Sequence, residues 1–242
     1  MTIQRLYIPQ KINENKPIHI TGDDFHYIKN VIRLKEDDEI LLFNNESGEF
    51  LSKLSKIEKR EMTITPLTQT RPADDEEIPN TELIFSPIKH NRQDLIIEKT
   101  TELGIKELSP IITKYTNNKN INLERLNTIA KEATEQSRRL SKPTINEPVS
   151  FIEKIRSFDF ENRTLVYLDE RPTQKNSIDI LKALKNKPVS FLIGPEGGFS
   201  PEEFEILKQT PAIGISLGDL ILRAETATIS IIAIYNIGIK ND

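Results

Sequence analysis

Short apolar runs, separated by polar turns, divide the chain into two parts with different patterns. In the first 70 residues, five runs predict strands, at residues 4–9, 18–21, 40–43, 49–54 and 62–67. A single helical face at residues 23–34 interrupts them, and Asp23 or Asp24 is placed to cap it. Several short strands with one helix in so few residues indicate a small β-barrel.

After residue 80, strand and helix patterns alternate regularly. Strands are predicted at residues 82–86, 108–112, 165–168, 189–193 and 213–217. Helices are predicted between and after them, at residues 93–103, 122–140, 178–184, 201–208 and 225–236. This alternation predicts an α/β domain in which helices cover both faces of a parallel sheet. Ligands of such sheets bind at the carboxyl ends of the strands.

The composition adds a domain boundary and several exclusions. Residues 71–80 contain four acidic side chains and one basic one, so they predict an acidic linker between residues 1–70 and 81–242. The formal net charge of −4 predicts no general nucleic-acid-binding face. Without cysteine, a long apolar run or a signal-peptide core, we expect a cytoplasmic protein with no membrane segment. The three histidines are scattered, so we expect no metal.

Two glycine-marked turns follow the fourth and fifth strands of the second part. The first is Gly194-Pro195-Glu196-Gly197-Gly198, and Ser200, Pro201 and Glu203 after it have the spacing of a capping box. The second begins at Leu217-Gly218 and leads through Arg223, Glu225 and Thr226 into an apolar helix. Neither turn has the spacing of a P-loop or a dinucleotide fingerprint. The pattern alone therefore predicts a backbone-lined ligand pocket, but not its ligand.

These motifs also carry a family resemblance. The matching residues in the second part of the chain are the Gly-Pro-Glu-Gly-Gly-Phe-Ser run at 194–200, Leu217-Gly218 with Ile221-Leu222-Arg223 and Glu225-Thr226, and residues 97–104 and 135–143. Several amino-terminal segments also match the family. The chain resembles ribosomal RNA small subunit methyltransferase E, a family of 16S ribosomal RNA uracil-N3 methyltransferases in the SPOUT class. Two residues depart from the family pattern. Arg138 stands at a common glycine position, and Leu220 stands at a common arginine position.

The resemblance implies a fold and an activity. Residues 1–70 would be a PUA-like, RNA-binding β-barrel, and residues 81–242 a SPOUT α/β domain with a trefoil knot. The protein would be a homodimer that uses S-adenosylmethionine to methylate 16S ribosomal RNA or the small ribosomal subunit. A non-catalytic RNA-binding protein and a SPOUT methylase of another RNA are the alternatives. The intact glycine turns argue against the first, and the family-like amino-terminal part argues against the second.

The resemblance and the chemistry of the residues together give candidate sites. The cofactor-binding candidates are Leu168, Gly194, Pro195, Glu196, Gly197, Gly198, Leu217, Gly218, Ile221 and Leu222. The catalytic candidates are Arg223, which would stabilise negative charge on the uracil, and Glu196 or Glu225, which would receive the N3 proton. The simpler alternatives are an Arg223–Glu225 ion pair and a turn-shaping role for Glu196. The RNA-binding candidates are Arg33, Lys89, Arg92, Arg138 and Arg139.

The last predicted helix, residues 225–236, is apolar around nearly its whole circumference. A helix with one face in water would carry a polar stripe, so we expect one face on the sheet and the other on a second subunit. The alternative is burial within a single subunit. Ile232→Lys should give a folded or partly folded monomer without activity if Ile232 lies at the interface, and should cost several kcal/mol of stability if it is buried without a partner for the ammonium.

Overall fold

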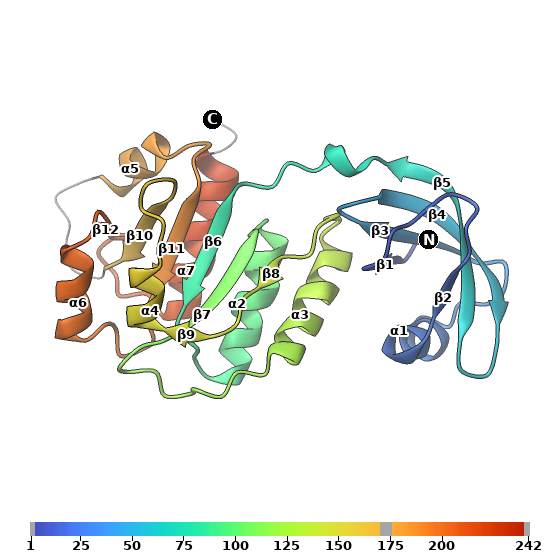
Figure 1. Ribbon diagram of the computed structural model, residues 1–242, viewed down its shortest axis with the longest axis horizontal. Coiled ribbons are helices and arrows are strands. Elements are labelled where there is room, and N and C mark those ends of the chain that lie inside the picture. Colours follow the sequence, from blue (N-terminus) through green and yellow to red (C-terminus); the bar gives the residue numbers. More distant parts are fainter. Residues whose placement is uncertain (1–2, 170–175, 240–242) are drawn as a thin grey trace. The chain divides into compact units, whose positions relative to one another are not determined.

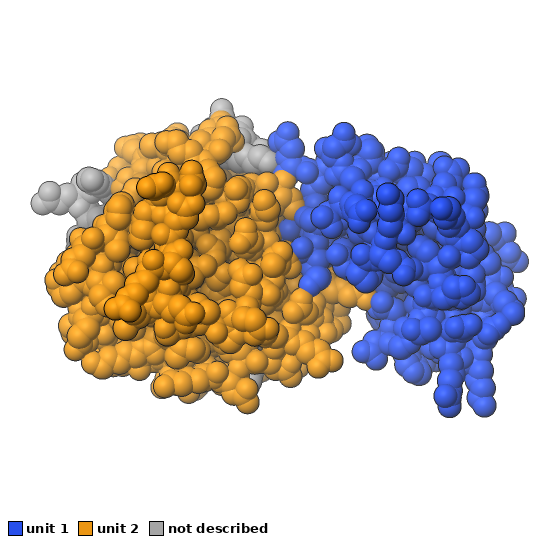
Figure 2. Space-filling view, in the orientation of Figure 1, with its two compact units in different colours: residues 1–77, 134–142 blue, residues 78–133, 143–242 orange. Residues whose placement is uncertain are grey.

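A computed structural model describes residues 3–169 and 176–239, and these residues form two compact units. Unit 1 comprises residues 1–77 and 134–142, and unit 2 comprises residues 78–133 and 143–242 (Figure 2). The chain thus leaves the first unit, returns to it for nine residues and leaves it again. Sequence periodicity gave no sign of this return.

Unit 1 is built on a five-stranded sheet with the order β1-β3-β4-β5-β2 (Figure 1). The strands are β1 (Arg5–Tyr7), β2 (Ile18–Ile20), β3 (Glu39–Asn44), β4 (Gly48–Ile57) and β5 (Met62–Arg71). All neighbours are antiparallel except β1 and β3, which are parallel. Three register shifts between β4 and β5 mark β-bulges, which increase the twist of the sheet. Strand β5 continues to Arg71, into the segment expected to be linker.

The helical segment of unit 1 differs from the expected single helix. It consists of α1 (Gly22–His26) followed by the π-helix η1 (Tyr27–Ile32). Phe25 and Ile28 are buried as expected, but Val31 is 68% exposed, because the wider π turn rotates it off the core face. The acidic residues of the first turn do not cap the helix, since Thr21 is the N-cap and makes no side-chain cap bond.

The returning segment is held in unit 1 by hydrogen bonds from Arg5. Helix α3 (Leu123–Gln136) ends four residues before the expected end at residue 140. Its last carbonyls would lack partners there, and the Arg5 guanidinium donates to the carbonyl oxygens of Thr134, Glu135 and Arg139 at 3.3, 2.9 and 2.8 Å. A cation at a helix C-terminus also interacts favourably with the helix dipole.

Unit 2 contains a seven-stranded sheet in which every pairing is parallel. Its main order is β12-β10-β11-β6-β7-β8, and β9 pairs with β7. The strands are β6 (Thr81–Phe85), β7 (Glu107–Ile112), β8 (Thr144–Ile145), β9 (Val149–Ser150), β10 (Thr164–Leu168), β11 (Val189–Ile193) and β12 (Ile213–Ile215). The predicted parallel sheet is confirmed. The chain passes from β11 over β10 to reach β12.

Alternate residues of the central strands bury opposite faces of this sheet. Val166, Phe191 and Ile193 belong to the core that contains residues of α2 (His90–Glu102), α3, α5 (Ser177–Ala183) and α7 (Ala224–Ala233). Leu165 and Leu192 belong to the core that contains residues of α4 (Phe151–Arg156) and α6 (Pro201–Lys208). The expected coverage of both faces is therefore confirmed. Helix α4 and strands β8 and β9 were not predicted, because two to six residues are too short for a periodic signal.

A buried ion pair supports the sheet away from the pocket described below. The Glu82 carboxylate of β6 accepts hydrogen bonds from the hydroxyls of Ser109 and Ser190 and from the Lys154 ammonium. Burial alone would raise the pKa of Glu82, but these donors hold it below its ordinary value. Helix α4 is thus fastened to three neighbouring strands by one carboxylate.

In the described part of the chain, no helix has the length and apolar character needed to cross a membrane.

Candidate cofactor pocket

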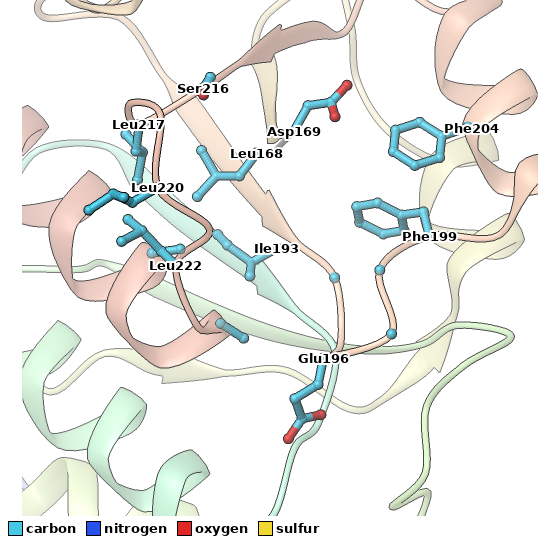
Figure 3. Close-up of a pocket in the computed structure, with 15 residues that line it drawn as sticks. Leu168, Asp169, Ile193, Glu196, Phe199, Phe204, Ser216, Leu217, Leu220 and Leu222 are labelled. Atoms are coloured by element: carbon cyan, nitrogen blue, oxygen red, sulfur yellow. The ribbon is translucent and has the colours of Figure 1, made fainter. Parts of the chain in front are cut away.

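The carboxyl ends of β10, β11 and β12 surround a cavity of about 330 Å³ (Figure 3). The segments after these three strands, together with α6 and α7, supply its walls: Leu168, Asp169, Ile193, Gly194, Glu196, Gly197, Gly198, Phe199, Phe204, Ser216, Leu217, Leu220, Leu222, Ala224 and Ala227. Leu168, Leu217 and Leu222 lie together on one side, and Phe199 and Phe204 lie on the other. Both glycine-marked turns meet in this one cavity.

Glycine is required in these turns for two separate reasons. Gly198 and Gly218 have φ values of +69° and +120°, a region that side chains disfavour. Gly194 and Gly197 are required for space instead. A Cβ atom would lie 3.3 Å from the Phe199 ring at Gly194, and 3.2 Å from the Tyr115 Cβ at Gly197. A side chain at either position would press on Phe199 or Tyr115, so glycine allows the first turn to pack closely against them.

Glu203 fixes the turn after β11 to the loop after β7. The predicted capping box of α6 is present: the Ser200 hydroxyl accepts from the Glu203 amide, and the Glu203 carboxylate accepts from the Ser200 amide at 2.8 Å. The other oxygen of this buried carboxylate accepts from the backbone amide of Lys114, also at 2.8 Å. One side chain thus caps a helix and joins two strand-end loops.

A cluster of buried hydroxyls connects the ends of β6 and β7. Ser86 and Thr116 hydroxyls are 2.6 Å apart, and the Thr116 hydroxyl accepts from the Thr113 amide at 2.8 Å. The Ser86 amide donates to the carbonyl of Ile193 at 3.0 Å, which ties this cluster to β11. Buried polar bonds thus join the ends of β6 and β7 to β11, whose last residue, Ile193, lines the cavity.

Two of the three catalytic candidates lie on either side of Arg92. The Arg92 Nη1 is 3.9 Å from the Glu196 Oε1, and its Nε is 3.5 Å from the Glu225 Oε1. The predicted alternative, an Arg223–Glu225 ion pair, does not form, and Arg92 takes the place of Arg223. Arg223 is the exposed N-cap residue of α7, and within the described residues it makes no ion pair.

Two family models match the chain. The RNA methyltransferase domain matches residues 76–236, and the RNA methyltransferase PUA domain matches residues 20–67. A ribosomal RNA small subunit methyltransferase E from Rickettsia conorii is 36% identical to the chain, covering 96% of it and 95% of the relative. The chain belongs to this family. The Bacillus subtilis member is 31% identical, with 93% of each protein covered. The predicted resemblance is confirmed.

Solved structures share the fold over nearly the whole chain. A putative methyltransferase from Legionella pneumophila with bound S-adenosylmethionine has a TM-score of 0.87, 22% identity and 98% coverage of both chains. The ribosomal RNA small subunit methyltransferase E of Neisseria gonorrhoeae, also bound to S-adenosylmethionine, has a TM-score of 0.79, 24% identity and 96% coverage of both. The chain therefore combines a PUA domain with the mixed α/β fold of the methyltransferase E family.

Most of the predicted cofactor-binding residues line the cavity. Those that do are Leu168, Gly194, Glu196, Gly197, Gly198, Leu217 and Leu222. Pro195, Gly218 and Ile221 do not line it; Pro195 is buried, and Gly218 and Ile221 are exposed. Sequence reasoning missed Asp169, Phe199, Phe204 and Ser216. The end of the strand at Leu168 was a usable signal for Asp169, and β12 ends at Ile215 rather than Leu217, which places Ser216 in the wall.

The five RNA-binding candidates are not equivalent. Arg33, Lys89 and Arg138 are exposed, as a phosphate contact requires. Arg139 is only 6% exposed, and burial lowers its pKa to about 10. This burial disfavours a direct contact between Arg139 and RNA, and the RNA-binding role of Arg139 stays a prediction. Arg92 is half-buried beside two carboxylates. Among the described residues, no group of three or more metal-ligating side chains is found.

Proposed function

We propose that this chain transfers the methyl group of S-adenosylmethionine to N3 of one uridine in 16S ribosomal RNA. The observation that carries the proposal is the meeting of the turns after β11 and β12 in a single cavity in a member of the methyltransferase E family. The R. conorii and B. subtilis relatives are named for action on small-subunit ribosomal RNA. The wild-type chain would act on that RNA in the cytoplasm.

The cavity suits S-adenosylmethionine in size and in chemistry. Its volume of about 330 Å³ lies within the range of about 300–1,000 Å³ that is usual for small-molecule pockets. Leu168, Leu217 and Leu222 would pack on the adenine, and Gly194 and Gly197 would offer backbone to the cofactor in the cavity wall. Asp169 and Glu196 are acidic residues among those that line this site for a cationic ligand. When bound, the cofactor supplies a methyl group on a positively charged sulfur.

The protein's own contribution would be to position the base and to manage its proton. Uracil N3 lies on the pairing edge, so the uridine must be unpaired before N3 can reach the cofactor. Correct positioning alone contributes about 7–11 kcal/mol to such reactions. Glu196 and Glu225 are the candidate proton acceptors, and Arg223 is a candidate to stabilise charge on the uracil from the mouth of the site. Arg33, Lys89 and Arg138 are exposed and suited to phosphates.

The finer assembly belongs to the same proposal. We expect the SPOUT class, with a trefoil knot near the crossing from β11 to β12 and a homodimer in solution. Leu220 and Ile221 are 81% and 80% exposed next to the cavity, an unusual place for two aliphatic side chains. A second subunit that covers them would complete the cofactor site. Sedimentation at micromolar concentration tests this assembly, and a monomer there would exclude it.

The activity can be tested directly. Small ribosomal subunits, or their free RNA, from a strain that lacks the enzyme would be incubated with the protein and labelled S-adenosylmethionine. The modified nucleotide would then be mapped and its methyl position determined by mass spectrometry. Label at N3 of one uridine supports the proposal. Label only in transfer RNA, or none in any RNA, would contradict it.

A further inference from the structure

The Arg92 side chain has hydrogen-bonding capacity that the protein does not use. Charged hydrogen bonds between a guanidinium and a carboxylate are normally about 2.7–2.9 Å long. The distances from Arg92 to Glu225 and Glu196 are 3.5 and 3.9 Å, so both are ion pairs without a hydrogen bond. No described residue accepts a hydrogen bond from this guanidinium, which has five N–H donors. Its donors therefore remain available beside the cofactor cavity.

The position of Arg92 is also unfavourable for its own helix. It is the third residue of α2, where the partial positive charge of the helix dipole opposes a cation. The first turn of α2 contains no acidic side chain that would offset this. A contribution to helix stability therefore does not explain the arginine, whereas a role at the neighbouring site does.

Among the described residues, the Glu225 carboxylate also lacks a hydrogen-bond partner that it could accept from. Only 8% of the residue is exposed, and its Oε2 atom is buried without a hydrogen-bond partner. Native proteins rarely leave a buried carboxylate oxygen unpaired, because the lost hydration is costly. Glu225 lies in the first turn of α7 and follows Ala224, which lines the cavity, although Glu225 itself does not line it. A ligand that enters beside the cavity, uncovers this oxygen and donates to it would supply the missing partner.

A guanidinium beside a carboxylate matches the pairing edge of uracil. That edge presents O2, N3–H and O4, which are an acceptor, a donor and an acceptor. We infer that Glu225 and Arg92 bind this edge together: Glu225 Oε2 accepts the N3–H, and Arg92 donates to one adjacent carbonyl oxygen. The inference rests on the proposed function and deepens it, because it assigns the proton acceptor and replaces Arg223 by Arg92 as the cation that touches the base.

The chemical step balances with these two residues. The N3 proton moves to the Glu225 carboxylate, and the N3 electron pair forms the new bond to the methyl carbon. The carbon–sulfur bond of the methyl donor breaks, and its electron pair stays on sulfur. Negative charge that develops on the uracil oxygen is stabilised by Arg92 in a partly enclosed site. Glu225 then releases the proton to water.

Glu196 and Arg223 fit these roles less well. The Glu196 side chain is 35% exposed and lies farther from Arg92 than Glu225 does. Its carboxylate points away from the aliphatic side chains of the cavity (Figure 3). Arg223 is exposed at the start of α7, where it suits a phosphate contact better than an enclosed base. The two groups at the mouth would help to hold the RNA rather than react with it.

The first test measures turnover with single and double variants. We expect Arg92→Gln and Glu225→Gln each to lower kcat about 10²- to 10³-fold with S-adenosylmethionine affinity unchanged. The double variant should be hardly worse than either single one, because the two residues act on one base. It also removes both charges, so it leaves no unpaired buried carboxylate that would unfold the protein. Arg92→Lys should recover part of the rate. Arg125→Gln, which removes an exposed arginine of α3, is the matched control.

The second test needs no methyl transfer. The affinity of S-adenosylhomocysteine-loaded protein would be compared for small subunits with uridine and with cytidine at the mapped nucleotide. Wild type should prefer uridine by about 5- to 150-fold, the range for a paired donor–acceptor contact to a base. Arg92→Gln should lose this preference, and Arg223→Gln should keep it. The inference is overturned if folded Arg92→Gln keeps its turnover or its preference, or if it fails through lost cofactor binding. Absent labelling by wild type would instead refute the proposed function.

Discussion

We expect Glu203→Ala to loosen the turn at residues 194–200, although Glu203 itself does not line the cavity. The variant removes two charged hydrogen bonds of 2.8 Å, to the backbone amides of Ser200 and Lys114. A hydrogen bond to a charged group contributes about 1.5–3 kcal/mol. Lys114 is exposed, so its amide regains water, but Ser200 is buried and its amide does not. We therefore expect unit 2 to lose about 3 kcal/mol of stability, near the lower end for two such bonds.

The same variant should weaken binding of S-adenosylmethionine by about 10-fold, because the cofactor must now order the turn at residues 194–200 on binding. Native-state hydrogen exchange at the two amides measures the opening directly, and calorimetry measures the affinity. Glu205→Ala is the matched control, since its exposed carboxylate on the same helix pairs with the Lys208 ammonium. It should change neither quantity. Equal exchange rates and equal affinity in Glu203→Ala and wild type would refute this account of the turn.

Three further substitutions test other parts of the structure. Gly197→Val should weaken cofactor binding strongly in calorimetry while circular dichroism stays unchanged, because the new side chain would press on Tyr115, 3.2 Å from its Cβ, and shift the turn. Wild-type affinity would remove this turn from the site. Ile232→Lys should unfold unit 2 rather than give a folded monomer, since Ile232 is 0% exposed within one chain and an unpaired buried ammonium costs several kcal/mol. The control Ile237→Lys, at a 54% exposed site, should stay folded in the same thermal melt. Arg138→Gly should raise the stability of unit 1 in urea unfolding, by about 0.5–1 kcal/mol, because Arg138 has a φ of +62°; a loss of stability would show that the left-handed backbone is not strained.

The sequence did not show how Ile232 is buried, because burial in the core of one chain and burial in a subunit interface give the same pattern of apolar residues. The helix is apolar on most sides and packs against α2 and β11, and the π-helix η3 (Ile234–Ile239) continues it. Ile229 and Ala233 of α7 are partly exposed. Periodicity counts apolar faces, but it does not tell which neighbour covers each face.

The sequence by itself determined the features that depend on neighbouring residues. Strand and helix positions in unit 2 follow from local periodicity, the capping box of α6 from Ser200 and Glu203, and the end of α2 from Gly104, whose φ is +84°. The two glycine turns were recognisable for the same reason. Each of these features is decided within a few residues of chain.

Only the tertiary structure decided which distant residues share the site. Arg92 and Glu225 belong to helices that follow different strands, and they meet because α2 packs against α7. The order of the strands places β10 between β11 and β12, and this order brings Asp169 into the cavity wall. Arg139 is buried because α3 ends early and the chain returns to unit 1. Such pairings depend on the packing of whole elements, and no local pattern of hydrophobic and polar residues encodes them.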